Sequence, residues 1–143
     1  MSNQIPKVSV IIPCKDVDGY VQECIQYCLA LDYPSFETLL LPDLPSSLEI
    51  GGVEVITTGP VKPAAKRNIG AKHATGELYA FIDSDAYPRK DWLKNALRYF
   101  QDLDVAGVGG ASITPEGDSL MQKASGAVYS SMMGGFRFAF RYS

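Results

Sequence analysis

Apolar residues fall in short, nearly continuous runs along the first two thirds of the chain. The runs occupy residues 7–13, 36–42, 53–57 and 78–82. The first run, KVSVIIP, is rich in β-branched residues and ends in proline, which is typical of a strand buried on both faces of a parallel sheet. The pattern therefore predicts four strands in this part of the chain.

Between these runs, apolar residues recur at the spacing of a helix. Asp18 is placed as an N-cap for a helix that ends before Pro34 and has apolar residues at Val21, Cys24, Ile25, Cys28 and Leu29. Residues 62–75 form a second candidate helix, with Pro63 in its first turn and Gly76 at its end. Pro88 opens a third, whose apolar face carries Leu93, Ala96, Leu97 and Phe100.

A glycine-rich run at residues 105–111 predicts one more short strand. Strands that alternate with helices indicate an α/β fold, in which a parallel or mostly parallel sheet carries helices on both faces. In open sheets of this kind, ligands bind at the carboxyl ends of the strands. The loops that follow the strands are therefore the first places to look for functional residues.

The last residues show a different period. Between residues 135 and 142, aromatic side chains alternate with arginine and alanine, and the aromatic positions are Phe136, Phe138, Phe140 and Tyr142. A period of two predicts an amphipathic strand, and an aromatic strand with a free edge recruits another strand. The preceding MMGG offers a hinge, so we expect a homo-oligomer formed through this segment.

The charge and composition of the chain bear on nucleic-acid binding, membrane insertion and disulfide formation. The chain has 143 residues with a net charge of −3 and a pI near 5.1, which does not favour nucleic-acid binding. The sequence shows neither a run long enough to span a bilayer nor the apolar core of a signal peptide. We expect a cytoplasmic protein, with association at the inner membrane face left open. Its three cysteines, Cys14, Cys24 and Cys28, are expected to be reduced thiols.

An acidic pair follows the fourth predicted strand. Asp83 and Asp85 stand at its carboxyl end, where two close carboxylates form a hard oxygen site suited to Mg²⁺ or Mn²⁺ carrying a diphosphate. The alternative is structural, because Asp85 is also placed to cap the helix that Pro88 opens.

Residues 62–93 contain a more specific arrangement. Arg67-Asn68 and Gly70 precede an Ala-Thr-Gly-Glu turn at residues 74–77, then the apolar strand and the acidic motif. This order resembles the family 2 glycosyltransferases, which implies the Rossmann-like GT-A fold. The resemblance is good over residues 1–111 and looser over residues 112–143. We therefore expect residues 1–143 to be the nucleotide-sugar-binding part of a domain truncated on its C-terminal side.

The resemblance implies roles for residues near the nucleotide base. Pro13 matches the position where the first strand ends against the base. Asp43 matches the acid that accepts a hydrogen bond from the base, although a plain turn residue between two prolines is the alternative. Lys62 matches a basic residue that some members place against the base or the phosphate, with a solvated lysine as the alternative.

The resemblance also implies roles around the diphosphate. Arg67 lies one helical turn beyond Lys62, and we assign it to donor binding as well. Asp83 matches the acid that approaches the ribose or the water shell of the metal, and Asp85 matches the direct metal ligand. Asn68 is expected to fix local geometry.

Two positions depart from the family pattern. The first strand usually leads into a Tyr-Asn pair, and here it leads into Cys14-Lys15-Asp16. The acid after the second strand is usually doubled, and here Pro42 precedes Asp43. Both positions lie around the base, so the resemblance leaves the identity of the nucleotide open.

The implied reaction transfers a sugar from a nucleotide-diphosphate donor to a hydroxyl of a glycan, a lipid-linked molecule or another acceptor. An inverting, metal-dependent transferase needs a general base for that hydroxyl. The acids after Asp85 are Asp91, Asp102, Asp104, Glu116 and Asp118. None matches the family's base by position, so we expect the base outside this chain.

Three alternatives remain at the sequence level. A haloacid-dehalogenase-type phosphatase also has an Asp-x-Asp after an apolar strand, but usually after the first strand. A sugar-nucleotide pyrophosphorylase would need a glycine-rich loop with Arg and Lys where this chain has PCKDVDGY. The third alternative is a fragment that binds nucleotide or associates with itself without catalysing a reaction.

Overall fold

The structure is a computed structural model that describes residues 5–46 and 49–131. Within it the chain forms two compact units, Met1–Asn95 and Ala96–Ser143. The first carries the sheet and all the residues that the sequence places at the nucleotide.

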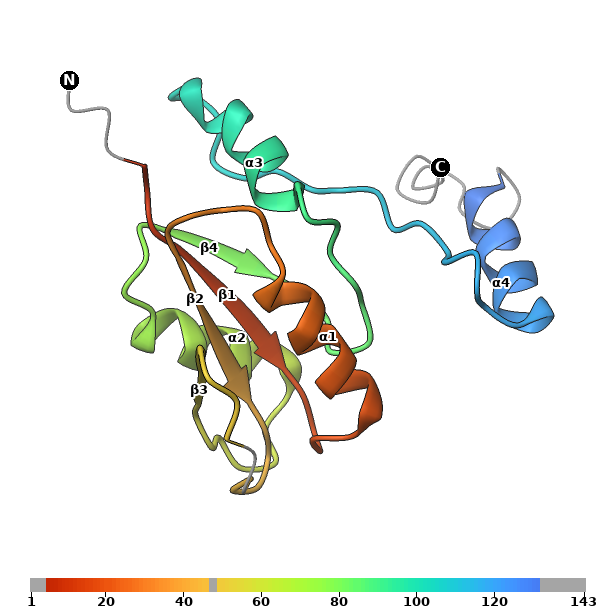
Figure 1. The fold of residues 1–143 in the computed structure, drawn as a ribbon, viewed down its shortest axis with the longest axis horizontal. Helices are drawn as coiled ribbons and strands as arrows, with labels where there is room; N and C mark the ends of the chain where they lie inside the picture. Colours follow the sequence, from red (N-terminus) through yellow and green to blue (C-terminus); the bar gives the residue numbers. More distant parts are fainter. Residues whose placement is uncertain (1–4, 47–48, 132–143) are drawn as a thin grey trace. The chain divides into compact units, whose positions relative to one another are not determined.

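The first unit is built on a parallel sheet, shown in Figure 1. Its strands are β1 (Val8–Pro13), β2 (Phe36–Leu41), β3 (Val53–Val55) and β4 (Leu78–Phe81), in the order β3-β2-β1-β4. All three pairings are parallel, which places the carboxyl ends of the strands along one edge. The four strands predicted from the apolar runs are confirmed.

Two helices cover the two faces of this sheet, α1 (Gly19–Leu29) and α2 (Pro63–His73) (Figure 1). The predicted N-cap of the first helix and the predicted proline of the second are both in place. Asp18 accepts a hydrogen bond from the Val21 N–H at 3.0 Å, and Pro63 occupies the first turn of α2. The expected α/β class with helices on both faces is therefore confirmed.

The core consists of the side chains between these layers. Ile11, Leu39 and Leu41 form a cluster on the α2 side, and Gly70 of α2 lies directly on it. A Cβ at Gly70 would lie 2.7 Å from Cγ2 of Ile11. On α1 the buried residues are Val21, Cys24, Ile25 and Cys28. The three cysteines are free and buried, as expected for reduced thiols.

Two helix boundaries differ from the sequence prediction. The second helix ends at His73 rather than beside Gly76. Gly76 instead packs against the backbone of β1, where a Cβ would lie 2.7 Å from the Ser9 nitrogen. The third helix, α3 (Trp92–Leu97), does not begin at Pro88. Residues 89–91 form a turn instead, in which the Lys90 carbonyl accepts a hydrogen bond from the Asp32 N–H at 2.8 Å.

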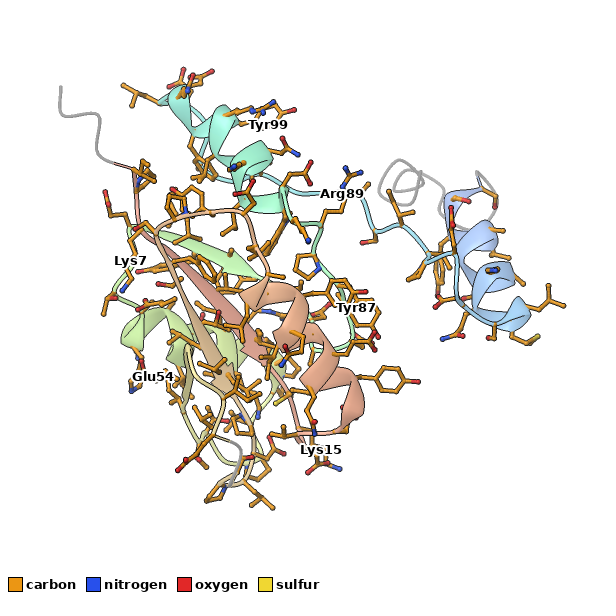
Figure 2. All side chains as sticks on the ribbon, viewed as in Figure 1. Lys7, Lys15, Glu54, Tyr87, Arg89 and Tyr99 are labelled. Atoms are coloured by element: carbon orange, nitrogen blue, oxygen red, sulfur yellow. The ribbon has the colours of Figure 1, made fainter. Side chains whose placement is uncertain are left out.

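A polar cluster holds the amino ends of the strands together. The Glu37 carboxylate accepts hydrogen bonds from Lys7 Nζ at 2.8 Å, from Ser9 Oγ at 2.5 Å and from the Thr75 N–H at 2.7 Å. Thr75 Oγ1 donates to it as well, at 2.6 Å, and the Gly76 N–H donates to Ser9 Oγ. This cluster ties the segment between α2 and β4 to both central strands (Figure 2 shows the side chains, with Lys7 labelled).

The second unit begins at Ala96 and includes the 3-10 turn η1 (Arg98–Gln101) and α4 (Leu120–Ser130), which starts with a capping box between Ser119 and Gln122. The strand predicted at residues 105–111 is wrong, because these residues have no regular structure. Their three glycines weaken a strand, and no strand in the described residues pairs with this segment. The strand and oligomer predicted at residues 135–142 lie outside the described residues.

Candidate functional site

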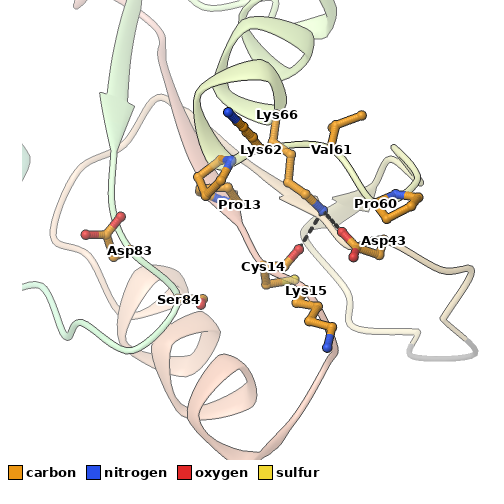
Figure 3. A pocket seen from close by; sticks show the side chains of 11 residues that line it. Pro13, Cys14, Lys15, Asp43, Pro60, Val61, Lys62, Lys66, Asp83 and Ser84 are labelled. Carbon is orange, nitrogen blue, oxygen red and sulfur yellow. Dashed lines mark hydrogen bonds and ion pairs between the residues drawn. The ribbon is translucent and has the colours of Figure 1, made fainter.

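A cavity of about 500 Å³ opens where the carboxyl ends of β1, β2 and β4 meet. Figure 3 shows it from close by. Its lining consists of Pro13, Cys14, Lys15, Asp43, Pro60, Val61, Lys62, Pro63, Lys66, Asp83 and Ser84. These residues come from the last residue of β1, from the loops that follow the four strands and from α2. A cavity in this place has the size and position of a small-molecule site in an open α/β sheet.

Pro13 and Cys14 form the wall at the end of β1, and both are buried. Burial is the largest influence on the Cys14 thiol and raises its pKa to about 11, although the nearby Lys66 ammonium opposes the change. The thiol is therefore neutral near pH 7. A neutral, buried thiol offers an apolar surface to the cavity.

Asp43 follows β2 and is held in place by Lys66. The Lys66 ammonium donates to the Asp43 carboxylate and to the Cys14 carbonyl at 2.7 Å (Figure 3). It also donates to the Leu41 carbonyl at 3.1 Å. Only 3% of the Lys66 side chain and 15% of the Asp43 side chain are exposed. The cavity thus contains a carboxylate that is largely withdrawn from water and already oriented.

Lys62 stands at the amino end of α2, just before Pro63 in the first turn. Lys62 is exposed, and it and Pro63 both line the cavity. The amino end of a helix carries a partial positive charge that favours anions. Together with the Lys62 ammonium, it provides positive potential at this side of the cavity.

Asp83 lies on the opposite side, in a turn after β4 where the Ala86 N–H donates to the Asp83 carbonyl at 3.0 Å. Its carboxylate pairs with the Arg67 guanidinium at 2.5 Å, and 67% of the Asp83 side chain is exposed. From below the turn, Cys24 Sγ donates to the Asp83 carbonyl at 3.6 Å. The acidic turn is therefore supported by α1 and α2, while its carboxylate remains accessible.

The acidic turn offers oxygen ligands but no complete metal site. Asp83 and Asp85 are both exposed, and Asp85 is not part of the cavity lining. The described residues contain no group of three or more His, Cys, Asp or Glu side chains that could hold an ion. Two accessible carboxylates suit Mg²⁺ or Mn²⁺, since such ions take few protein ligands and complete their shell with water and phosphate oxygens. The donor set therefore fits the implied ion.

The structure brings together most residues that the sequence singled out. Pro13, Asp43, Lys62 and Asp83 all line one cavity, and Arg67 contacts it through its ion pair with Asp83. The residue whose importance sequence reasoning missed is Lys66. A signal for it was present: Lys66 lies four residues before Gly70, so both share the helix face that packs on the sheet.

With this geometry established, sequence comparison identifies the family. The chain matches glycosyl transferase family 2 over residues 9–140. Because the match covers most of the chain, the chain belongs to this family, as its motifs predicted. The fold is the GT-A fold, as predicted from the same resemblance.

Two curated relatives illustrate the range of the family. One is a dolichyl N-acetyl-alpha-D-glucosaminyl phosphate 3-beta-D-2,3-diacetamido-2,3-dideoxy-beta-D-glucuronosyltransferase of Methanococcus voltae, 24% identical over 90% of this chain and 46% of the relative. The other is the poly(ribitol-phosphate) beta-N-acetylglucosaminyltransferase TarS of Staphylococcus aureus, 28% identical over 75% of this chain and 22% of the relative. The chain therefore spans less than half the length of either.

Solved structures share the fold. S. aureus TarS 1–349 in complex with UDP has a TM-score of 0.64 and 24% identity, over 80% of this chain and 38% of that one. The mannosyltransferase PcManGT of Pyrobaculum calidifontis, in complex with GDP-Man and Mn²⁺, has a TM-score of 0.59 and 20% identity, over 90% of this chain and 40% of that one. Separately, no helix in the described part of the chain is long and apolar enough to cross a bilayer.

Proposed function

We propose that this chain is the nucleotide-sugar-binding part of a glycosyltransferase that transfers a sugar from a nucleotide-diphosphate donor to an acceptor hydroxyl. The observation that carries the proposal is the cavity, which has an oriented carboxylate, Asp43, on one side and an accessible acidic turn, Asp83 to Asp85, near the other. Family membership supports it, as do structural relatives in complex with UDP-GlcNAc and with GDP-Man and Mn²⁺.

The base and the ribose occupy the side of the cavity formed by β1 and β2 in this proposal. Pro13 and the neutral Cys14 offer an apolar wall for a planar base. Asp43 accepts a hydrogen bond from a ring N–H of the base. Lys62 and the amino end of α2 attract the negative charge of the nucleotide.

The diphosphate and its cation occupy the side near the acidic turn. When bound there, Mg²⁺ or Mn²⁺ would neutralise charge on the leaving diphosphate. Asp85 is the proposed direct ligand, and Asp83 approaches the ribose or the water shell of the cation. Arg67 positions the Asp83 carboxylate through the ion pair seen in the structure.

The reaction is proposed to invert the configuration of the sugar, which requires a general base near the acceptor hydroxyl. In the described residues, none of the acids after Asp85 lines the cavity. Asp91, the first of them, is half-buried and paired with Arg89 at 3.2 Å, and a hydrogen bond with Asn95 is the main cause that lowers its pKa. We propose that the base belongs to an acceptor-binding part outside the described residues.

Isothermal titration calorimetry with UDP, GDP and dTDP, each with and without Mn²⁺, tests donor binding. At least one should bind, and Asp43→Ala should weaken that binding about 10- to 100-fold, since a hydrogen bond to a charged group contributes about 1.5–3 kcal/mol. If Asp43 is only a turn residue, the variant will lose melting temperature but not affinity. Failure of all three nucleotides to bind would refute the proposal.

A second candidate is a binding module without catalysis. It is favoured because, among the described residues, the only acids that line the cavity are Asp43 and Asp83, and both are assigned to the donor. An assay that follows hydrolysis of radiolabelled UDP- and GDP-sugars separates the two. Turnover of a bound sugar nucleotide favours the enzyme. Tight binding without turnover, with and without added acceptors, favours the module.

A further inference from the structure

Lys66 is a charged side chain buried in the first unit, with 3% of its surface exposed. It extends from α2 to the point where β1 and β2 end. Taking an ammonium group out of water costs several kcal/mol unless every hydrogen finds a good acceptor. A lysine in such a place therefore needs either a complete set of partners or a functional reason to be there.

The partners of Lys66 use its full donor capacity. An ammonium group has three hydrogens, and Nζ of Lys66 has three acceptors: the Cys14 carbonyl, the Leu41 carbonyl and the Asp43 carboxylate. No hydrogen is left for a ligand, even though Lys66 is part of the cavity lining. Lys66 must therefore act on a ligand through the groups that it holds.

Of the three groups, only Asp43 is a side chain that can change its orientation. Its backbone is already fixed, because its N–H donates to the Lys15 carbonyl at 3.0 Å and its carbonyl accepts from the Gly59 N–H at 3.1 Å. Lys66 engages one carboxylate oxygen, Oδ1. The other oxygen has no donor among the described residues and belongs to a side chain of the cavity lining.

We infer that Lys66 is a positioning residue that sets the base selectivity of the cavity. It holds Asp43 so that one carboxylate oxygen faces the ligand as a fixed acceptor. Uracil, thymine and guanine present a ring N–H that satisfies this acceptor. Cytosine and adenine carry a lone pair on the corresponding ring nitrogen, which a carboxylate repels. The inference rests on the proposed function, because it assumes that a nucleoside diphosphate occupies the cavity.

A double-mutant cycle measured by calorimetry tests this role. UDP, GDP, dTDP, CDP and ADP are titrated, in Mn²⁺, into the wild-type chain, Lys66→Met, Asp43→Asn and the double variant. We expect the wild type to prefer the first three, and Lys66→Met to lose about 10-fold or more in affinity for them, so that the preference disappears. In the Asp43→Asn background, Lys66→Met should change affinity less than about twofold, because the effect passes through Asp43.

The control is Lys72→Met, which removes an exposed lysine from the same helix outside the cavity and should leave the preference unchanged. If Lys66→Met does not fold, Lys66→Gln retains a donor for Asp43 without the charge, and its loss of preference is measured in the same way. Retained preference in the lysine variant, or additive effects in the cycle, overturns this inference alone. A wild-type chain that binds no nucleoside diphosphate overturns both this inference and the proposed function.

Discussion

The charged residues at the two ends of the sheet differ from those of the acidic turn in their hydrogen-bond partners and their exposure. Glu37 at the amino ends and Lys66 at the carboxyl ends each have several hydrogen-bond partners and little exposure. Asp83 and Asp85 are exposed, and Asp83 is paired with a single arginine. Fully partnered charges stabilise the fold, whereas exposed carboxylates at the edge of a cavity remain available for an ion or a ligand.

The first residue-scale prediction concerns the acidic turn. Asp85→Ala should abolish the dependence of nucleoside-diphosphate binding on Mn²⁺, because it removes the proposed direct ligand. Since Asp85 is exposed, the melting temperature should change little. Calorimetry in Mn²⁺ and in EDTA measures the dependence, with Asp104→Ala as a control for loss of an exposed acid. Equal affinity of the wild-type chain in EDTA and Mn²⁺ would contradict the prediction.

The second residue-scale prediction concerns Glu37. Burial raises the pKa of Glu37, but hydrogen bonds from Lys7, Ser9 and Thr75 outweigh it and lower the pKa from 4.5 to about 2. A carboxylate with a lowered pKa in the folded state stabilises the fold above the unfolded pKa, and this contribution is lost as pH falls through the folded pKa. Glu37→Gln should therefore cost about 1–3 kcal/mol at pH 7 and much less near pH 2.

Thermal melts of wild type and Glu37→Gln between pH 7 and pH 2 measure this difference. The gap in melting temperature should be constant above about pH 5 and should shrink below it. Glu54→Gln, at an exposed position of β3, is the matched control and should show no such gap. A gap that does not depend on pH would mean that Glu37 contributes through packing rather than charge.

At the scale of elements, two glycines let helix and loop approach β1 closely. A Cβ at Gly76 would lie 2.7 Å from the Ser9 nitrogen and 2.8 Å from the Lys7 carbonyl oxygen, and backbone atoms of a central strand cannot move away. A Cβ at Gly70 would meet side-chain atoms of Ile11, which can shift a little. Close packing against β1 therefore explains why this chain has glycine at these two positions of the family's motif.

The third prediction follows from those distances. Gly76→Ala should destabilise the fold by about 3 kcal/mol or more, and Gly70→Ala by about 1–2 kcal/mol, since the gain in helix propensity offsets part of the overpacking. Gly19→Ala, at the first residue of α1 with no atom within 4 Å of the new Cβ, should be nearly neutral. Urea unfolding of the three variants gives the order, and a Gly76→Ala variant as stable as Gly19→Ala would contradict it.

The elements that the sequence predicted correctly are those set by local pattern. The run at Val8–Pro13 and the cap at Asp18 depend on neighbours in the chain, so periodicity and capping rules found them. The strand predicted at residues 105–111 is wrong because a strand also needs a partner strand, which its own sequence does not specify. The role of Lys66 was missed for a similar reason, since its three acceptors lie 23, 25 and 52 residues away along the chain.

At the scale of the whole molecule, the candidate site and the second unit are separate parts of the chain. Every residue that lines the cavity lies between Pro13 and Ser84, within the unit Met1–Asn95. The buried hydrophobic core also lies in this unit, between Val8 and Leu93. The expected oligomer through residues 135–142 concerns the other unit and stays a prediction, which light scattering on a chain ending at Ser131 would test.

The last prediction is that nucleotide binding needs no residue after Gln101. A chain that ends at Gln101 keeps the sheet, α1, α2, α3 and the 3-10 turn that follows α3, so it keeps every lining residue and the Lys66–Asp43 pair. We expect it to fold cooperatively and to bind the preferred nucleoside diphosphate within about threefold of the full chain, a difference below about 1 kcal/mol. Calorimetry on both chains, after circular dichroism has shown that the shorter one melts in a single transition, measures the ratio. A folded short chain that binds more than about 10-fold more weakly would mean that residues after Gln101 contribute to the site.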